Sequence, residues 1–395
     1  MSRRNPVREM LGRRLRLAVI GGGPGSFVGG IHRVAARLDD RYELVAGVLT
    51  SDPARSRAAG VDIGLAEDRS YGEVSEMLDA EAARHDGADV VAIMTPNDSH
   101  HLLASSALAG GFDVVLDKPL TNTLEEALDL LERVRSTGLV LCLTHNYTGY
   151  PMVRQARAMV QDGELGDIRL VQVEYVQGGK AAQNDPDPAD GLPWRYDPVR
   201  GGPSLVLGDI GSHAHNLARF ITGLEVSEVA AEVGAIVAGR LVDDYAAAML
   251  RFGNGERGSL WVTQAAAGVE NRLRISVSGS GGTVAWSQEE PNSLTFLPLD
   301  APGQIRTPNG PGTLPLAARS TRMPPGHPEA FYEAFANLYS DAGEVIAARR
   351  SGTTPDPLAL QFPNVVDGVL GVKFAEAAIA SSRAGGAWTS AALDL

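Results

Sequence analysis

Short apolar runs alternate with amphipathic stretches along the first part of the chain. The runs are rich in apolar and β-branched residues and end in glycine, proline or polar residues, which is typical of strands buried on both faces of a sheet. The stretches between them place apolar residues at helical spacing, as Phe27, Ile31 and Leu38 do. This order predicts a parallel sheet covered by helices. The expected strands cover residues 15–20, 43–49, 88–94, 114–116 and 139–144, and the expected helices cover 27–38, 73–85, 102–108 and 123–137.

The second part of the chain alternates between two faces, as strands of a half-buried sheet do. One strand is expected to place Ile168, Leu170, Gln172, Glu174 and Val176 on one face and Arg169, Val171, Val173, Tyr175 and Gln177 on the other. Because the first of these faces is mixed, we expect the sheet to be covered on only part of its area. Further strand-like runs at 226–237, 246–252, 257–262, 273–278 and 283–286 are separated by turns and indicate an antiparallel meander. Helices are expected at 152–161, 329–349 and 365–383.

Two long segments carry no regular pattern. Residues 178–204 include Trp194, Arg195 and Tyr196, and loops of this length in a compact domain are usually functional or disordered. Trp194 can stack on the apolar face of a sugar ring while Arg195 binds its hydroxyls or a carboxylate; a lid anchored by a buried tryptophan is the alternative. Residues 287–328 hold nine of the 23 prolines, which predicts a semi-rigid flap or a loop that contacts another subunit.

Composition excludes several classes of protein. The 395 residues include 35 basic and 48 acidic side chains, a formal net charge of -13, whereas proteins that bind nucleic acids usually carry a basic excess. The single cysteine, Cys142, lies in an apolar run and is expected to be a core residue in a reducing compartment, not a catalytic thiol.

The N-terminus is rich in arginine, as export signals are. The apolar run that follows, Leu17 to Ile20, is shorter than the about 7 residues that a signal core needs. No later stretch approaches the roughly 18 apolar residues of a membrane span. We therefore expect a cytoplasmic protein without a membrane partner, in which residues 1–14 form a solvated arm.

A glycine-rich turn follows the first strand. Glycines between a strand and a helix allow the backbone to approach a pyrophosphate, which then lies on the amides of the helix N-terminus. Gly21 and Gly23 match the first two positions of the pattern Gly-x-Gly-x-x-Gly, and Ser26 occupies the third. The position of this turn in a βαβ pattern favours a dinucleotide site over a turn without a ligand.

The end of the second strand bears on the choice of nucleotide. An acid at this point binds the adenosine ribose, and its absence leaves room for a 2′-phosphate. Thr50 or Ser51 occupies that place here, and Arg55 or Arg57 can pair with a phosphate, which makes NADP credible. Asp52 can instead serve as the ribose acid, so NAD remains open.

Three further strand ends carry polar clusters. They are Thr95-Pro96-Asn97, followed by His100; Asp117-Lys118-Pro119; and His145-Asn146-Tyr147. The carboxyl ends of parallel strands meet at one edge of a sheet, where ligands bind. The repetition at one edge therefore predicts a binding crevice with Lys118 in it.

The candidate chemistry of the second part lies at Asp209 and His213. On a helix these residues share a face, with Cβ atoms within about 6 Å, so the acid can hold one imidazole nitrogen and leave the other free to take a proton. A metal site at His213 and His215 is not expected, because positions i and i+2 diverge by about 200° on a helix and no cluster completes a ligand shell.

The order of these motifs, with Gly163-Glu164-Leu165-Gly166 beyond them, resembles the glucose-fructose oxidoreductase, inositol dehydrogenase and rhizopine-catabolism (Gfo/Idh/MocA) family. The family's usual motif is Glu-Lys-Pro, and Asp117 replaces the glutamate here. The resemblance implies a Rossmann domain followed by an α/β domain with a large, mostly antiparallel open sheet. It also implies hydride exchange between NAD or NADP and a sugar or cyclitol hydroxyl.

Carried over, the family's catalytic lysine, aspartate and histidine are Lys118, Asp209 and His213. His213 is the general base, Asp209 orients it, and Lys118 binds the reacting oxygen. The residues expected to contact the nucleotide are Gly21, Gly23, Pro24, Gly25, Ser26, Phe27, Thr50, Ser51, Arg55, Thr95, Pro96, Asn97, His100, Asp117, Lys118 and Asn146. Those expected to contact substrate are Lys118, Tyr147, Tyr150, Trp194, Arg195, Asp209 and His213.

These observations lead to an α/β enzyme in two domains behind an arm at 1–14. A Rossmann domain at 15–147 binds NAD or NADP, and residues 148–395 bind a sugar, glycoside or cyclitol and form a homo-oligomer, a dimer or tetramer, through their sheet. The expected activity is that of an NAD(P)-dependent sugar or polyol dehydrogenase of EC 1.1.1 type. A glycosidase or lyase that retains NAD and acts by transient oxidation, and a regulator that binds NAD(P) without catalysis, are the alternatives.

Overall fold

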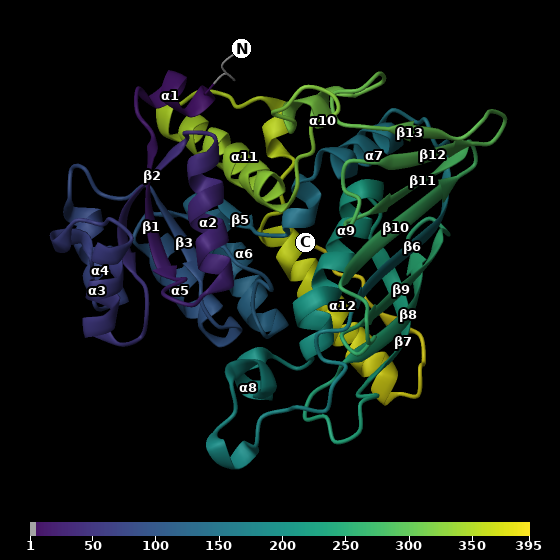
Figure 1. The fold of residues 1–395 in the computed structure, drawn as a ribbon, viewed down its shortest axis with the longest axis horizontal. Coiled ribbons are helices and arrows are strands. Elements are labelled where there is room, and N and C mark those ends of the chain that lie inside the picture. Colours follow the sequence, from purple (N-terminus) through teal and green to yellow (C-terminus); the bar gives the residue numbers. More distant parts are fainter. Residues whose placement is uncertain (1–4) are drawn as a thin grey trace. The chain divides into compact units, whose positions relative to one another are not determined.

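The computed structural model describes residues 5–395, which fall into two compact units (Figure 1). The first unit runs to Thr121 and adds Glu125–Gly149 and Phe331–Gly368, and the second consists of Asn122–Leu124, Tyr150–Ala330 and Val369–Leu395. Each unit is built on its own sheet. Within residues 5–395, no helix combines the length and the apolar character that crossing a membrane requires.

The sheet of the first unit is parallel throughout and has the strand order β2-β1-β3-β4-β5. β3 and β4 are buried along their whole length, as their continuous apolar runs predicted. This is the doubly wound sheet of the expected Rossmann domain. Its strands are β1 (Leu15–Gly21), β2 (Tyr42–Val48), β3 (Val90–Met94), β4 (Asp113–Leu116) and β5 (Leu141–Leu143).

One long helix of the first unit comes from far along the chain. α11 (Phe331–Ser351) lies beside α2 (Phe27–Leu38), and α1 (Pro6–Leu11) packs against α11 (Figure 1). The ring of His32 on α2 lies 4.8 Å from that of Phe335, centroid to centroid, and the Tyr42 hydroxyl donates to the carbonyl of Tyr339. The sequence-based domain limits placed α11 in the second domain, but these contacts make it part of the first unit. The other helices of this part are α3 (Pro53–Asp62), α4 (Val74–Ala83), α5 (His100–Ala109) and α6 (Leu124–Thr137).

The expectation of a solvated arm is wrong for the described part of residues 1–14, since residues 6–11 form α1. Asn5 caps this helix by accepting the N–H of Arg8, and Val7 is fully buried. Arg8 and Arg14 both pair with Asp40. These partners are distant in sequence, which is why the local pattern did not reveal them. Residues 1–4 of the expected arm lie outside the described residues.

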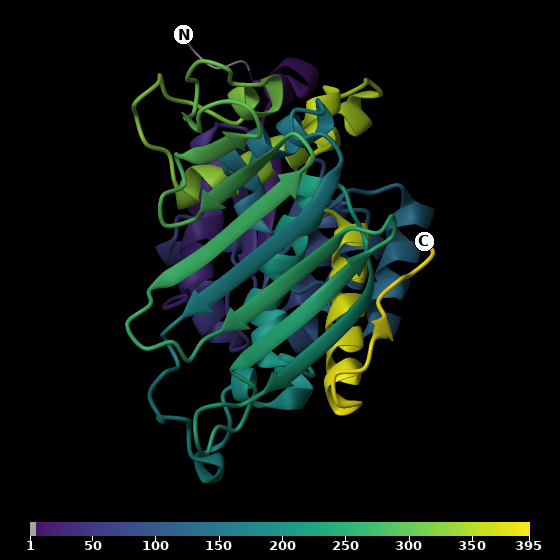
Figure 2. The same cartoon turned by 90° about the vertical axis from the view of Figure 1, so that its right-hand side faces the viewer.

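The sheet of the second unit has the order β13-β12-β11-β10-β6-β9-β8-β7-β14 (Figure 2). β6 lies between β10, to which it is antiparallel, and β9, to which it is parallel. The sheet is mostly antiparallel, as expected, but a simple meander is wrong because β6 divides it. The strands are β6 (Ile168–Gln177), β7 (Val226–Gly234), β8 (Tyr245–Phe252), β9 (Arg257–Thr263), β10 (Asn271–Gly279), β11 (Gly282–Ser287), β12 (Leu294–Pro298), β13 (Gln304–Arg306) and β14 (Thr389–Ser390).

Residues 287–328 are more regular than their proline content suggested, since they contain β12, β13 and α10 (Pro315–Arg319). Pairing with β11 orders β12, and such a distant pairing leaves little local signal. Residues 178–204 are irregular, as expected. They contain only short helical turns, of which α8 (Pro198–Gly201) is the longest. The remaining helices are α7 (Pro151–Gln161), α9 (Ser212–Thr222) and α12 (Val365–Arg383).

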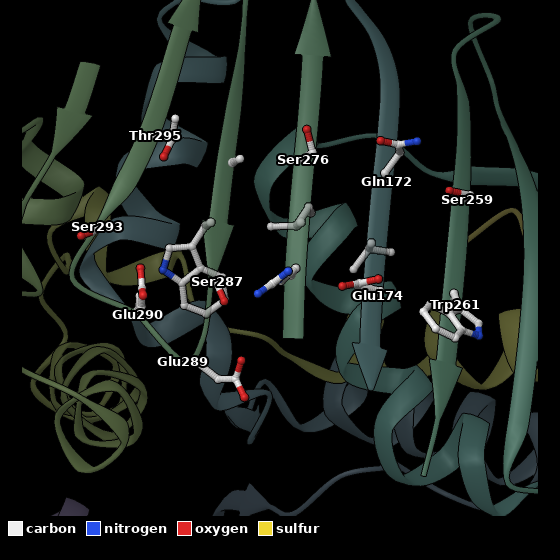
Figure 3. Close-up of a pocket in the computed structure, with 15 residues that line it drawn as sticks. Gln172, Glu174, Ser259, Trp261, Ser276, Ser287, Glu289, Glu290, Ser293 and Thr295 are labelled. Atoms are coloured by element: carbon white, nitrogen blue, oxygen red, sulfur yellow. The ribbon is translucent and has the colours of Figure 1, made fainter. Parts of the chain in front are cut away.

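The two faces of the second sheet differ. α9 packs against β6, β9 and β10, and α7 packs against α9, so this inner face buries Val171, Val173 and Tyr175. The outer face carries Gln172, Glu174 and Trp261 around a hollow of about 650 Å³ (Figure 3). The faces are those that the alternation of residues 168–177 predicted.

Candidate active site

The glycine-rich turn joins β1 to α2 with very close backbone packing. Gly21 has φ +82°, and a Cβ there would lie 2.6 Å from the carbonyl oxygen of Met94. Ser26 caps α2 by accepting the N–H of Gly29 at 3.2 Å. A Cβ on Gly29 would lie 2.2 Å from the carbonyl oxygen of Gly22. Gly29 therefore performs the helix-packing role of the third glycine in the motif, and Ser26 does not. The pair Gly29-Gly30 was the feature of the sequence that could have indicated this role.

The turn fits the pyrophosphate of a dinucleotide. Free N–H groups and the positive end of the helix dipole favour an anion at the first turn of α2. A Cβ at Gly25 or Gly30 would meet no atom within 4 Å, so there is open space beside these amides. Arg33 fixes the turn from the helix side by donating to the carbonyl of Gly22 at 2.7 Å. Pro24 and Phe27 lie in the same turn and are exposed.

The end of β2 lies next to this turn, since a Cβ on Gly23 would lie 2.5 Å from the carbonyl oxygen of Leu49. Asp52 caps α3 by accepting the N–H of Arg55 at 2.8 Å. Arg57 pairs with Glu76 at 3.0 Å, which engages one of the two candidate phosphate partners. The Thr50 hydroxyl donates to the carbonyl of Asp52 at 3.0 Å, whereas Ser51 and Arg55 are exposed on this edge.

Hydrogen bonds tie together the ends of β3, β4 and β5. His100 lies between the carbonyls of Pro119 (2.8 Å) and Thr95 (3.0 Å). Burial lowers the pKa of His100, so the neutral ring donates to only one of them at a time. Asp117 accepts the N–H of Lys118 at 3.0 Å and the hydroxyl of Thr144 at 2.8 Å. His100 thus has a structural role whether or not it contacts a nucleotide.

These bonds place the remaining candidates of the first unit at one sheet edge. Lys118 is half-buried at the end of β4, and Asn97 and Asn146 are buried after β3 and β5. The side-chain Nδ2 of Asn146 has no hydrogen-bond partner in the described part of the chain. The Tyr147 ring packs edge-on against Phe331, 6.3 Å between centroids, and is 4% exposed.

In the second unit, Asp209 and His213 lie where a π-helical turn (Leu207–Gly211) runs into α9. Such turns often occur at functional sites. Asp209 is half-buried and accepts a hydrogen bond from the Gln264 amide at 2.8 Å. His213 is 8% exposed, and its ring centroid lies 6.4 Å from that of Tyr175.

A chain of amides behind Asp209 was missed from the sequence. The Gln264 amide also donates to Gln177 (3.2 Å), and Gln177 donates to Asn271 (2.7 Å), which accepts the hydroxyl of Tyr175 at 2.9 Å. Gln264 is 4% exposed, and the two hydrogen bonds of its side-chain nitrogen fix this amide against Asp209 and Gln177. One signal was available: Gln177 is the only amide on the strand face that otherwise carries Val171, Val173 and Tyr175 inward.

The other substrate candidates of the second unit differ in exposure. Arg195 is exposed and stacks on Trp194, 4.2 Å from the guanidinium carbon to the ring centroid, in the turn Trp194–Tyr196. Tyr150 is 1% exposed and packs against Trp286, with centroids 5.4 Å apart. Residues 5–395 contain no group of three or more His, Cys, Asp or Glu side chains placed to hold a metal ion.

One unit has a parallel sheet with a dinucleotide turn, and the other has a mostly antiparallel sheet packed against α9, where Asp209 and His213 lie. These features define a two-domain NAD-binding oxidoreductase. The chain belongs to the Gfo/Idh/MocA family. Residues 15–145 match the family model "Oxidoreductase family, NAD-binding Rossmann fold", and residues 153–285 match "GFO/IDH/MocA C-terminal domain".

Similar proteins support this assignment over nearly the whole chain. An oxidoreductase from Sinorhizobium meliloti shares 42% identity, covers 95% of this chain and 99% of its own, and has a TM-score of 0.86. An inositol dehydrogenase homolog from Azotobacter vinelandii, solved with NADH and myo-inositol, shares 34% identity over 96% and 98% of the two chains, with a TM-score of 0.88. The uncharacterized oxidoreductase YfiI of Bacillus subtilis is 31% identical over 96% of this chain and 98% of its own.

Proposed function

We propose that the protein transfers hydride between NAD(P) and a hydroxyl of a sugar, glycoside or cyclitol. The observation that carries this proposal is that Asp209 and His213 lie four residues apart where a π-helical turn runs into α9, with the Asp209 carboxylate accepting a hydrogen bond from the buried Gln264 amide at 2.8 Å. The complex of the Azotobacter vinelandii homolog with NADH and myo-inositol supports it, since a polyol is bound there with the reduced cofactor.

In this proposal His213 takes the proton of the reacting hydroxyl. Asp209 orients the imidazole and stabilises its protonated form, and Gln264 prevents the carboxylate from turning away. Lys118 donates to the reacting oxygen and stabilises the negative charge that builds on it. The bound nicotinamide supplies the acceptor for the hydride.

The test is substrate turnover by variants of the two proposed catalytic residues. Lys118→Ala and His213→Ala should each lower kcat by about 100-fold or more, because each removes a charge or proton acceptor used at the reacting oxygen. Affinity for NADH, measured by fluorescence titration, should change little. Turnover is followed by the absorbance of the reduced nicotinamide over a panel of polyols and glycosides with both cofactors.

Lys373→Ala and His101→Ala are the controls, since these residues lie on α12 and α5 outside the proposed site. Unchanged turnover in Lys118→Ala or His213→Ala would contradict the assigned roles. Turnover of a glycoside without any net change in nicotinamide absorbance would instead favour the glycosidase or lyase.

We further propose that copies of the chain associate through the outer face of the second sheet. This face exposes Leu170, Met249 and Trp261, with exposed fractions of 53%, 64% and 38%. Basic and acidic side chains alternate among them, as in the pair of Arg272 and Glu174 (3.1 Å), which suits a surface that meets its own copy across a two-fold axis.

A further inference from the structure

Lys180 is bonded through its backbone to the residue that holds Asp209, the proposed partner of His213. Its N–H donates to the carbonyl of Gln264 at 2.9 Å, and Gln264 is the residue whose side chain holds Asp209. Its own carbonyl accepts from Arg240 at 2.7 Å. The backbone of Lys180 is therefore fixed on both sides, at the start of the long segment 178–204.

The Lys180 ammonium has no hydrogen-bond acceptor among residues 5–395. It lies 5.9 Å from the centroid of the Tyr196 ring, and the residue is half-buried. Burial lowers the pKa of Lys180, and Asp209 is the acid that most opposes this effect. Across residues 5–395 the ammonium makes no hydrogen bond or ion pair. A partly buried cation without a partner costs free energy, which a ligand that accepts its hydrogen bonds recovers.

The neighbouring cations fall into two groups. The side chain of Arg240 is fully buried and is neutralised by Asp185 (2.9 Å) and Asp244 (3.7 Å). Arg195, whose charge also acts on Lys180, is exposed and stacks on Trp194, and it has no ion pair in the described structure. Lys180 and Arg195 are therefore the two cations left for a ligand.

The choice of lysine at this position is itself informative. The chain has three lysines, Lys118, Lys180 and Lys373, among its 35 basic residues, so arginine supplies nearly all of its positive charge. Lysine differs from arginine in carrying a compact ammonium whose three donors rotate toward an acceptor. Two of the three lysines lie in the proposed site.

We propose that Lys180 and Arg195 form an anion-binding arm of the substrate site, and that the substrate is a polyhydroxylated compound bearing a carboxylate or a phosphate. This inference rests on the proposed function. In this proposal the anionic group binds Lys180 and Arg195 while the reacting hydroxyl binds His213, so the two groups lie at different ends of the substrate. The two cations thus fix which hydroxyl reaches His213.

The first experiment compares substrates that differ only in the anionic group. D-glucose, D-glucuronate and D-glucose 6-phosphate form one set, and D-galactose and D-galacturonate form another. An anionic member should exceed its neutral partner in kcat/KM by about tenfold or more.

Lys180→Met should remove this preference through a higher KM, whereas Lys180→Arg should keep part of it, and Lys373→Met should leave it intact. Equal use of neutral and anionic members, with no change in Lys180→Met, would overturn the proposal. The carboxylate and phosphate members distinguish the two anions.

A second measurement does not depend on turnover. Pyridoxal 5′-phosphate with borohydride should label Lys180 about tenfold faster than 5′-deoxypyridoxal, which has a free aldehyde but no phosphate, because Arg195 attracts the phosphate. Peptide mapping assigns the label among three lysines, and Arg195→Met should abolish the difference. Equal labelling by both reagents would refute the arm. If no polyol is oxidised but this labelling pattern holds, the dehydrogenase proposal fails and the arm stands.

Discussion

His32 shows how burial fixes the charge of a single side chain. The residue is fully buried, and its Nδ1 shares a hydrogen bond of 2.7 Å with the hydroxyl of Tyr339. Burial lowers the pKa of His32 to about 4, so the ring is neutral in the folded protein at neutral pH. In the unfolded chain an exposed histidine takes a proton near pH 6.5.

The free energy of unfolding should therefore fall as the pH drops. Between about pH 6.5 and 4 the unfolded chain binds the proton and the folded protein does not. The contribution of neutral His32 to the free energy of unfolding is therefore fully present above pH 6.5 and is lost as the pH falls toward 4. For this shift the loss is roughly 3 kcal/mol. Urea unfolding at several pH values should show a weaker pH dependence in His32→Gln. The same slope in both proteins would contradict a neutral buried His32.

At the scale of residues, the sequence predicted side chains whose role follows from their place at a strand end. Lys118 and Asp117 were found because they interrupt an apolar run. The roles of Gln264 and Lys180 were not predicted, because they depend on the contact of Gln264 with Asp209 and on the bond from the Lys180 N–H to the Gln264 carbonyl. Whether Lys118, Asp209 and His213 perform the chemistry assigned to them stays a prediction.

At the scale of elements, Gly29 and Gly30 provide a matched pair of substitutions within α2. Gly29→Ala should lower the melting temperature and weaken NADH binding at least tenfold, because the new Cβ would lie 2.2 Å from the carbonyl oxygen of Gly22 and push the helix off the turn. Gly30→Ala meets no atom within 4 Å and should leave the melting temperature equal or higher. Calorimetry and NADH titration measure both effects. If the two variants melt alike, close helix packing at Gly29 is not essential.

The sequence located most elements but not all of their partners. Strands and helices with strong periodicity, such as β1, α2 and β6, were placed within a few residues. The sequence did not predict the position of β6 between β10 and β9, because pairing between distant strands is decided by the tertiary fold and not by local pattern. For the same reason β12 and β13 were taken as irregular.

At the scale of the whole molecule, we expect self-association through the outer face of the second sheet. Trp261→Glu places a charge among the exposed apolar residues of that face and should shift the protein to a smaller species in sedimentation velocity. Leu102→Glu alters an apolar residue on α5 that is even more exposed (67% against 38%) and serves as the control. An unchanged sedimentation coefficient for Trp261→Glu, or a monomeric parent protein, would argue against this interface.

The return of α11 to the first unit limits how this chain can be divided or recombined. A fragment that stops at Gly149 keeps all five strands of the nucleotide-binding sheet but lacks Phe335 and Tyr339, the rings that cover His32. Such a fragment would expose an apolar surface to water and tend to aggregate. Chimaeras that exchange the nucleotide-binding part therefore have to carry residues 331–368 along with it.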